Sequence, residues 1–319
     1  MPQLVIINRV YVIIKFPYAN ELIANCSLPS YTLRMGIITK TERLNPLNDF
    51  LFLKVMGEKG NEEQLLGFLN AVLGSAPGSR LESIEILEGR ALTPEILGDK
   101  ASILDVRSLT EDGTRVNIEV QLRNYGDMDR RSLFYWSKEY SRQIKGGGDY
   151  IDLPKVIAIN IVDFNFINSK KFHTCFHLWE DTEKNLMLTD ALEIHFVDMV
   201  KFRTLGYTVE GSGSFLDSPL NRWLTFFDKN SPKELLQEVL KMDAAIKKAH
   251  DRTTFVTQDD AAMTEYIRRE MALSDWTSGV NYALRERDKE IARKLKTLGI
   301  PVAHITESTG LTEKQINDL

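Results

Sequence analysis

Asp105, Glu119 and Gln121 are the residues of this sequence whose types and spacing fit metal-assisted chemistry. They lie on two strand-like segments, residues 103–109 and 116–122. Alternate residues of a strand share one face, so each segment has an apolar face and a polar face. The polar faces carry the two carboxylates and the Gln121 amide. Two carboxylates that face each other repel unless a cation lies between them, and Mg²⁺ or Mn²⁺ prefers such hard oxygen ligands.

The turn that ends at Gly113 sets the register of this predicted hairpin. A three-residue loop places Gly113 at the left-handed position that such loops favour. Asp105 then lies opposite Glu119, and the next pair is Val106 with Ile118. A two-residue loop would pair apolar with polar residues and mix the two faces. The hydrophobic pattern therefore predicts the register that brings the two carboxylates together.

A metal ion between these carboxylates has a defined use. It would generate hydroxide near neutral pH and stabilise charge on a phosphoryl group under attack. Gln121 points into the same site, where its amide could orient water or a phosphate. The alternative is a surface hairpin whose acidic face is solvated, because sheets with one wet side often carry charges there. The residue pattern alone does not decide between these two interpretations.

The elements around the hairpin predict an α/β fold with a mixed sheet. The apolar run at residues 155–162 is typical of a strand buried on both faces. Helices on both sides of the sheet follow from the order of helices and strands. Further strands are expected at 84–87, 172–178 and 192–197, and helices at 45–74 and 129–145. In the helix at 129–145, one face is expected to carry Leu133, Trp136, Tyr140 and Ile144.

The chain divides into three predicted regions: an extension at residues 1–39, an α/β core at 40–215 and a mainly helical region at 216–319. The first 34 residues are expected to be a mis-called start or a loosely attached arm. The helical region ends in two short helices joined at Thr309-Gly310, an arrangement like a helix-turn-helix unit. DNA contact by the last helix and packing against protein are both open, because that helix carries acidic as well as basic residues.

Composition sets further limits on function. The net charge of −5 argues against simple electrostatic binding of DNA by the whole chain. Two cysteines, Cys26 and Cys175, give no disulfide framework, and a reducing cytoplasm is the expected location. No apolar run is long enough to span a membrane, and we expect no signal peptide.

A second set of chemically active residues alternates along one predicted strand. His173, Cys175 and His177 share a strand face. A zinc site would need a fourth ligand, which the sequence does not identify, so a strand with polar residues on one face is the simpler interpretation. A zinc-stabilised interaction module is nevertheless a third hypothesis for this chain. No Gly-rich nucleotide loop and no Gly-x-Ser-x-Gly elbow occurs.

At the hairpin residues the sequence resembles the PD-(D/E)XK nuclease family transposases, also called the Rpn family of recombination-promoting nucleases. The likeness covers about residues 40–250, and its blocks occur in the family's order with fitting spacings. The blocks lie at residues 47–57, 65–73, 100–106, 117–121 and 135–144.

The resemblance implies a restriction-endonuclease-like α/β fold and a DNA endonuclease that depends on Mg²⁺ or Mn²⁺, associated with recombination or a mobile element. It makes Asp105 and Glu119 metal ligands. Gln121 stands where the wider superfamily has a lysine. The cationic role is therefore left to Lys100 or Lys54.

Three further residues are expected near this site by the same resemblance. Asp49 would add a carboxylate, either as a ligand or next to one. Gln143 is expected to face the site and Tyr140, one helical turn away, to pack beneath it. A symmetric dimer would suit double-strand cutting. The main alternative is a DNA- or protein-binding regulator with a degenerate core, which the missing lysine favours and the retained carboxylates oppose.

Overall fold

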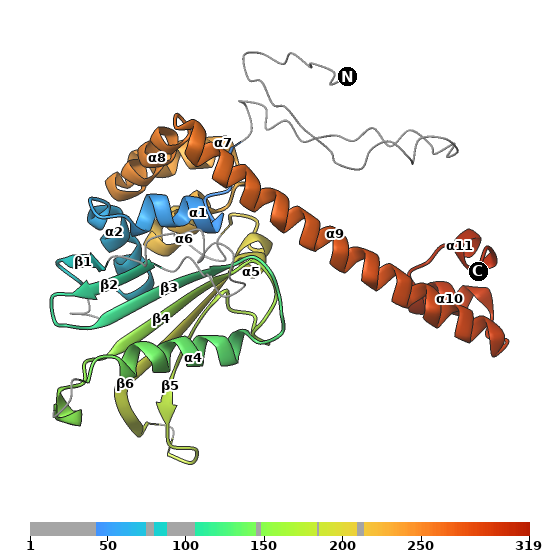
Figure 1. Cartoon of the computed structure of the whole chain (residues 1–319), viewed down its shortest axis with the longest axis horizontal. Helices are drawn as coiled ribbons and strands as arrows, with labels where there is room; N and C mark the ends of the chain where they lie inside the picture. Colours follow the sequence, from blue (N-terminus) through green and yellow to red (C-terminus); the bar gives the residue numbers. More distant parts are fainter. Residues whose placement is uncertain (1–42, 75–79, 88–105, 145–147, 184, 209–213) are drawn as a thin grey trace, which may run out of the picture. The chain divides into compact units, whose positions relative to one another are not determined.

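The computed structural model describes residues 43–74, 80–87, 106–144, 148–183, 185–208 and 214–319 (Figure 1). Two residues of the predicted site, Asp105 and Lys100, lie outside the described residues. So do Cys26 and the predicted N-terminal extension.

One mixed sheet forms the centre of the described structure. Its six strands follow the order β1-β2-β3-β4-β6-β5. The β3/β4 and β4/β6 pairs are parallel, and the other neighbours are antiparallel. The strands are β1 (Ile84–Leu87), β2 (Val106–Thr110), β3 (Arg115–Gln121), β4 (Val156–Val162), β5 (His173–Trp179) and β6 (Met187–Asp198).

Helices cover both faces of this sheet. Helix α4 lies along one face, and α1, the π-helical turn η1 and α2 lie on the other (Figure 1). This arrangement confirms the predicted restriction-endonuclease-like α/β fold. The helical elements are α1 (Asp49–Phe52), η1 (Leu53–Gly57), α2 (Glu62–Leu73), α4 (Met128–Ser141), η2 (Tyr150–Asp152), α5 (Met199–Thr204), η3 (Phe215–Asp217), α6 (Pro219–Phe227), α7 (Lys233–Met242), α8 (Ala244–Val256), α9 (Asp260–Thr297), α10 (Val302–Thr309) and α11 (Glu313–Asn317).

The β2–β3 hairpin has the predicted three-residue loop. Gly113 has a φ of +85°, the left-handed conformation that the loop requires. The Thr110 N–H donates to the Thr114 carbonyl at 3.0 Å and closes the loop. Val106 pairs with Ile118, so the register predicted from the hydrophobic pattern is confirmed where both strands are described.

Strand β4 is buried at every position, as the continuous apolar run predicts. Toward α4, Ala158 and Val162 join a core with Met128 and Phe196. On the other side of the sheet, α2 and α6 share an aromatic core, with Phe68 against Trp223 at 5.7 Å between ring centroids. Burying such side chains contributes about 1.5–3 kcal/mol each and fixes the helices on the sheet.

The face of α4 that was predicted to carry Leu133, Trp136 and Tyr140 is only partly covered. Leu133 is 51% exposed, and Ile144, beyond the end of the helix, is 36% exposed. The buried residues of the helix are Met128, Ser132 and Glu139. The physical reason is the sheet beneath, which presents polar side chains from β2, β3 and β4 and therefore requires polar partners.

The C-terminal helices agree with the sequence pattern. Helix α9 begins beside α1, where the Tyr266 hydroxyl accepts the Asn45 N–H at 2.9 Å. Its end forms a small core with α10 and α11 that includes Ile305 and Ile316. The two short helices predicted around Gly310 are confirmed, and this glycine has a φ of +69°. Helices α6 and α8 pack against α2, while the predicted boundary near residue 215 stays a prediction.

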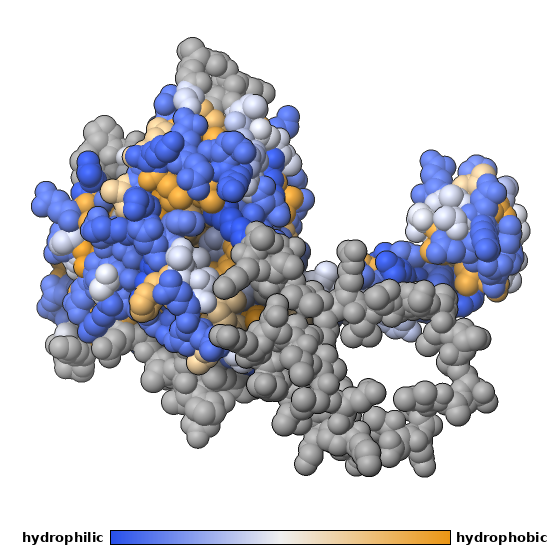
Figure 2. Space-filling view, turned by 90° about the horizontal axis from the view of Figure 1, so that it is seen from above, coloured by the Kyte–Doolittle hydropathy of each residue, from blue (hydrophilic) through white to orange (hydrophobic). Residues whose placement is uncertain are grey.

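None of the helices in the described residues is long and apolar enough to cross a membrane. The face shown in Figure 2 is mostly hydrophilic over the described part of the chain. Hydrophobic side chains reach this surface in separate areas between the charged ones.

Candidate active site

Glu119 occupies the middle of the sheet on the face that α4 covers. It pairs with Asn160 of β4, and paired residues of neighbouring strands point to the same face. The Asn160 side chain donates to the Ser132 hydroxyl of α4 at 2.8 Å, which identifies that face. Glu119 is 1% exposed. A carboxylate this deeply buried needs a compensating charge or hydrogen bonds.

Arg131, in the first turns of α4, supplies such a charge. Its Nη2 lies 2.9 Å from Glu119 Oε1, and the Arg131 side chain is 24% exposed. Burial lowers the pKa of Arg131 and the Glu119 carboxylate raises it, with a net pKa above the ordinary value. The alternative of a solvated acidic hairpin face is therefore wrong for Glu119, which is enclosed between sheet and helix.

Other polar contacts continue this interface toward the far end of α4. Arg107 of β2 donates to Glu139 at 3.0 Å, and Glu139 is 8% exposed. Among the described residues, Asn117 Oδ1 and Arg131 Nε are buried atoms without a hydrogen-bond partner. Such atoms are uncommon in folded proteins, and a ligand, an ion or a water molecule is one way to satisfy them.

The donors on this face fit a hard cation. One face of β3 carries three side-chain oxygen donors: the Glu119 carboxylate, the Asn117 amide oxygen Oδ1 and the Gln121 amide oxygen. Oxygen atoms are the ligands that Mg²⁺ and Mn²⁺ prefer. The Gln121 amide nitrogen donates to the Arg123 carbonyl at 2.9 Å, which fixes the orientation of this side chain at the end of the strand.

Lys54 lies away from this face. Its Nζ is 2.5 Å from Glu58, one helical turn along the chain. A Cβ added at the neighbouring Gly57 would meet the Val106 side chain, so η1 packs on the face that carries Val106. That face is opposite to the face of Glu119, because Val106 pairs with Ile118 and alternate residues point to opposite sides.

Asp49 already has a cationic partner. Its Oδ2 lies 2.9 Å from Nη1 of Arg269 in α9, and its Oδ1 accepts the Phe50 N–H at 2.8 Å. The carboxylate is 35% exposed. Its role as an additional carboxylate of the active site stays a prediction.

Gln143 and Tyr140 lie toward the other end of α4. The Gln143 oxygen accepts from Nε of Arg115 at 3.0 Å. Arg115 begins β3 four residues before Glu119, about 13 Å along an extended strand. Tyr140 stacks on Trp136 with 4.9 Å between ring centroids. The structure therefore does not bring Gln143 to Glu119, and it places Tyr140 in packing against the helix itself.

Arg131 is the site residue that the sequence interpretation missed. The signal was partial, since α4 starts seven positions after Gln121 and its first turns therefore lie close in sequence to the end of β3. An arginine at that position is consequently a candidate partner for Glu119.

Comparison with known proteins supplies independent information. A family model described as PD-(D/E)XK nuclease family transposase matches residues 46–283. Neither the curated proteins nor the solved structures include a match. The matched segment takes in the β2–β3 hairpin, α4 and most of the C-terminal helices, which is well over half of the chain. The chain therefore belongs to the PD-(D/E)XK nuclease family transposases.

Proposed function

We propose that this protein is a metal-dependent DNA endonuclease that hydrolyses phosphodiester bonds in recombination or in the movement of a mobile element. The observation that carries the proposal is the buried Glu119 carboxylate, 2% exposed, beside a guanidinium and oxygen donors under α4. Membership of a nuclease family supports the same chemistry.

In this proposal Glu119 and Asp105 hold the metal ion, Mg²⁺ or Mn²⁺. Glu119 presents its carboxylate from the centre of the sheet, where exclusion of water strengthens its attraction for a cation. The role of Asp105 as a metal ligand is supported by the family resemblance and by the strand register that pairs Val106 with Ile118. The bound ion would supply a hydroxide nucleophile near neutral pH and stabilise charge on the phosphate. Gln121 would orient water or a phosphate oxygen at the end of β3.

Arg131 takes the role of the lysine that Gln121 replaces. Its guanidinium lies at the acidic site, with one Nη bound to Glu119 and with Nε lacking a partner among the described residues. Arginine binds phosphate through two parallel hydrogen bonds, so it can hold the scissile group and stabilise its developing charge. Lys100 stays a second candidate for this role.

The alternative function is that of a DNA- or protein-binding regulator without cleavage. The observation in its favour is the same ion pair, because Arg131 neutralises the carboxylate that would bind the metal. In that case the arginine has a structural role and the helical C-terminal region carries the function.

Nicking of supercoiled plasmid decides between these functions. The proteins are wild type, Asp105→Asn, Glu119→Gln, Arg131→Gln and Arg131→Lys, each with Mg²⁺, Mn²⁺ or chelator. Glu238→Gln, at an exposed position of α7, is the matched control for loss of one carboxylate. We expect metal-dependent nicking by wild type and control, loss of nicking in the two acid variants, and partial rescue of Arg131→Gln by Arg131→Lys. A folded wild type that nicks DNA with neither metal would reject the endonuclease proposal in favour of the regulator.

The proposed setting follows from the same chemistry. DNA is the substrate, and two copies of the chain would cut both strands in the way that a symmetric dimer allows. The cytoplasm is the proposed compartment, where the free thiol of Cys175 stays reduced. The ratio of linear to nicked plasmid at rising protein concentration tests the dimer.

A further inference from the structure

Strands β5 and β6 bring a second group of ligand-type side chains together. His173, Cys175 and His177 alternate along β5, and Cys175 pairs with His195 of β6. His195 in turn pairs with Ile159 of β4, which faces away from α4. The cluster therefore lies on the opposite face of the sheet from Glu119 and is separate from the proposed nuclease site.

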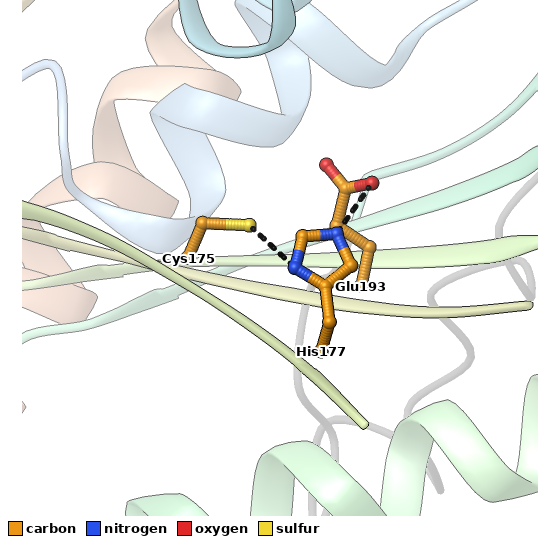
Figure 3. Close-up of side chains that lie close together, drawn as sticks. All are labelled: Cys175, His177 and Glu193. Atoms are coloured by element: carbon orange, nitrogen blue, oxygen red, sulfur yellow. Dashed lines mark hydrogen bonds and ion pairs between the residues drawn. The ribbon is translucent and has the colours of Figure 1, made fainter. Parts of the chain in front are cut away.

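Glu193 of β6 completes a three-residue group that the sequence pattern of β5 alone could not provide. One ligand atom from each of Cys175, His177 and Glu193 lies within 4.8 Å of the other two (Figure 3). Cys175 Sγ is 3.8 Å from His177 Nδ1, whereas the other ring nitrogen of His177, Nε2, lies 3.4 Å from Glu193 Oε2. An imidazole gives one nitrogen to an ion, so Nδ1 is the ligand atom of His177 beside Cys175. Figure 3 shows these side chains pointing toward one another across the strand pair.

His195 adds a fourth ligand atom. Its Nε2 lies 3.6 Å from Cys175 Sγ and 2.5 Å from Glu193 Oε1. Bond lengths of 2.0–2.3 Å in a tetrahedral zinc site place ligand atoms about 3.3–3.8 Å apart. The contacts of Cys175 have these separations, whereas Glu193 has to turn away from its present contacts with His195 Nε2 and His177 Nε2 to share one ion with the other ligands.

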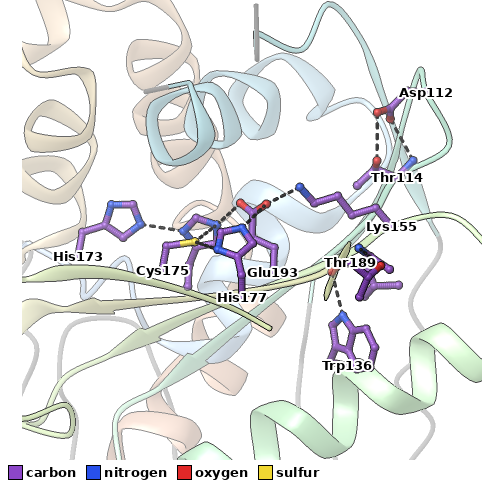
Figure 4. A network of polar contacts seen from close by, with 12 residues as sticks. Asp112, Thr114, Trp136, Lys155, His173, Cys175, His177, Thr189 and Glu193 are labelled. Atoms are coloured by element: carbon purple, nitrogen blue, oxygen red, sulfur yellow. Dashed lines mark hydrogen bonds and ion pairs between the residues drawn. The ribbon is translucent and has the colours of Figure 1, made fainter. Parts of the chain in front are cut away.

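Two more residues hold this group in place from outside. His173 Nε2 lies 2.9 Å from His195 Nδ1. In the tautomer in which His195 Nδ1 donates to His173, the lone pair of His195 Nε2 is free to bind an ion beside Cys175. Lys155 forms an ion pair with Glu193 (Figure 4). Hydrogen-bonded partners of this kind orient the ligands of most protein metal sites. His195 is 4% exposed whereas Cys175 is exposed, so an ion can reach a partly enclosed site from one side.

The chemistry of the donors selects the ion. A thiolate with two imidazoles and a carboxylate does not suit Mg²⁺, which requires oxygen ligands, but it suits zinc. We propose that Cys175, His177, Glu193 and His195 form a zinc site that joins edge strand β5 to β6. The thiol proton leaves to solvent as the Zn–S bond forms.

A structural role agrees with the position of the site. Strand β5 is at the edge of the sheet, and its pairing with β6 is irregular between Phe176 and Trp179. A zinc ion bound by both strands would stabilise this edge next to the irregular segment. The proposal does not depend on nuclease activity, because the ligands and Glu119 are on different faces.

The test uses full-length protein purified without metal-affinity resin. Elemental analysis is expected to give about one zinc per chain after dialysis, as four protein ligands hold zinc tightly. Replacement by Co²⁺ should give a thiolate-to-cobalt charge-transfer band in wild type. Cys175→Ser should abolish this band, and His173→Ala should weaken zinc binding about tenfold through the lost outer contact. His304→Gln, at an exposed position of α10, is the control.

The wild-type measurement keeps the proposal refutable if a variant fails to fold. If folded wild type contains no zinc and shows no charge-transfer band at excess Co²⁺, the four residues form a hydrogen-bond network and not a metal site. Zinc retained at full stoichiometry by folded Cys175→Ser and His177→Gln would place the ion elsewhere. Either result overturns the proposed site, whether or not the protein cleaves DNA.

Discussion

Removal of the contact between Arg131 and Glu119 should reveal a strong energetic coupling. The changes are Arg131→Met, Glu119→Gln and both together. Arg131 Nη2 lies 2.9 Å from Glu119 Oε1, and the two side chains are 24% and 2% exposed. Arg131→Met takes a charge away from a carboxylate that water hardly reaches. Glu119→Gln keeps the shape of the side chain while it removes the charge.

The expected magnitude follows from burial. Breaking a fully buried ion pair by removing one partner costs about 3–5 kcal/mol, and exposed pairs contribute about 0.2–1 kcal/mol. Glu119 is at the buried limit, but Arg131 keeps partial contact with water. We therefore expect a coupling free energy of roughly 2 kcal/mol between the two positions.

Reversible denaturant unfolding of the four proteins in chelator measures this coupling. The single variant Arg131→Met should have the lowest free energy of unfolding of the four proteins. Adding Glu119→Gln to it should recover part of the lost stability, because the double variant has no charge buried at this contact. A coupling below about 0.5 kcal/mol, the range seen for independent sites, would refute the reasoning. Added Mg²⁺ should stabilise Arg131→Met more than wild type if the ion binds Glu119, since a ligand of the folded state raises its stability.

Three further substitutions test other parts of the fold. Gly113→Ala should destabilise the protein by about 1–2 kcal/mol, because φ is +85° there. Gly279→Ala, in the exposed middle of α9 with no atom within 4 Å of its added Cβ, should instead stabilise by up to about 1 kcal/mol. Equal effects of these two changes on the unfolding midpoint would contradict the conformational argument. Ile305→Ala truncates a side chain that is 0% exposed, a change that lowers stability by about 2–5 kcal/mol at a packed site. We expect α10 and α11 of this variant to become sensitive to protease while the sheet stays folded. A tail as resistant as that of wild type would show that its small core is dispensable.

The parts of the fold that depend on local pattern were predictable. The register of Val106 with Ile118 follows from alternation and from Gly113, which are both local in sequence. The contact between Arg131 and Glu119 depends instead on how a helix crosses a sheet, and apolar periodicity does not report that. Nor did periodicity indicate that Leu133 would be exposed and Glu139 buried, because the sheet face beneath α4 is partly polar.

The group around Cys175 shows the same limit at longer range. The alternation of His173, Cys175 and His177 is visible in the sequence, and the strand prediction is confirmed. Glu193 arrives from another strand after an intervening loop, so no local spacing indicates it. Of the predicted nuclease residues, Asp105 and Lys100 lie outside the described residues, and the role of Glu119 stays a prediction.

The second half of helix α9 buries few side chains. The whole helix has 38 residues, and after Tyr266 the next buried residue is Ala292. The ring centroids of Trp276 and Tyr125 are 5.7 Å apart. After that contact no residue of the helix is buried before Ala292. A stretch that buries so little side-chain surface is held by its own backbone hydrogen bonds and by pairs such as Glu290 with Lys294, 2.7 Å apart.

Such a stretch responds to the solvent differently from the sheet. Added salt weakens exposed ion pairs, because it shortens the screening length below its value of about 8 Å at physiological ionic strength, and heat reduces helix propagation. Salt screening acts much less on buried groups such as those of β4. We therefore expect the second half of α9 to unwind before the sheet when salt or temperature rises, and this unwinding to begin near Gly279, because glycine is a weak helix former.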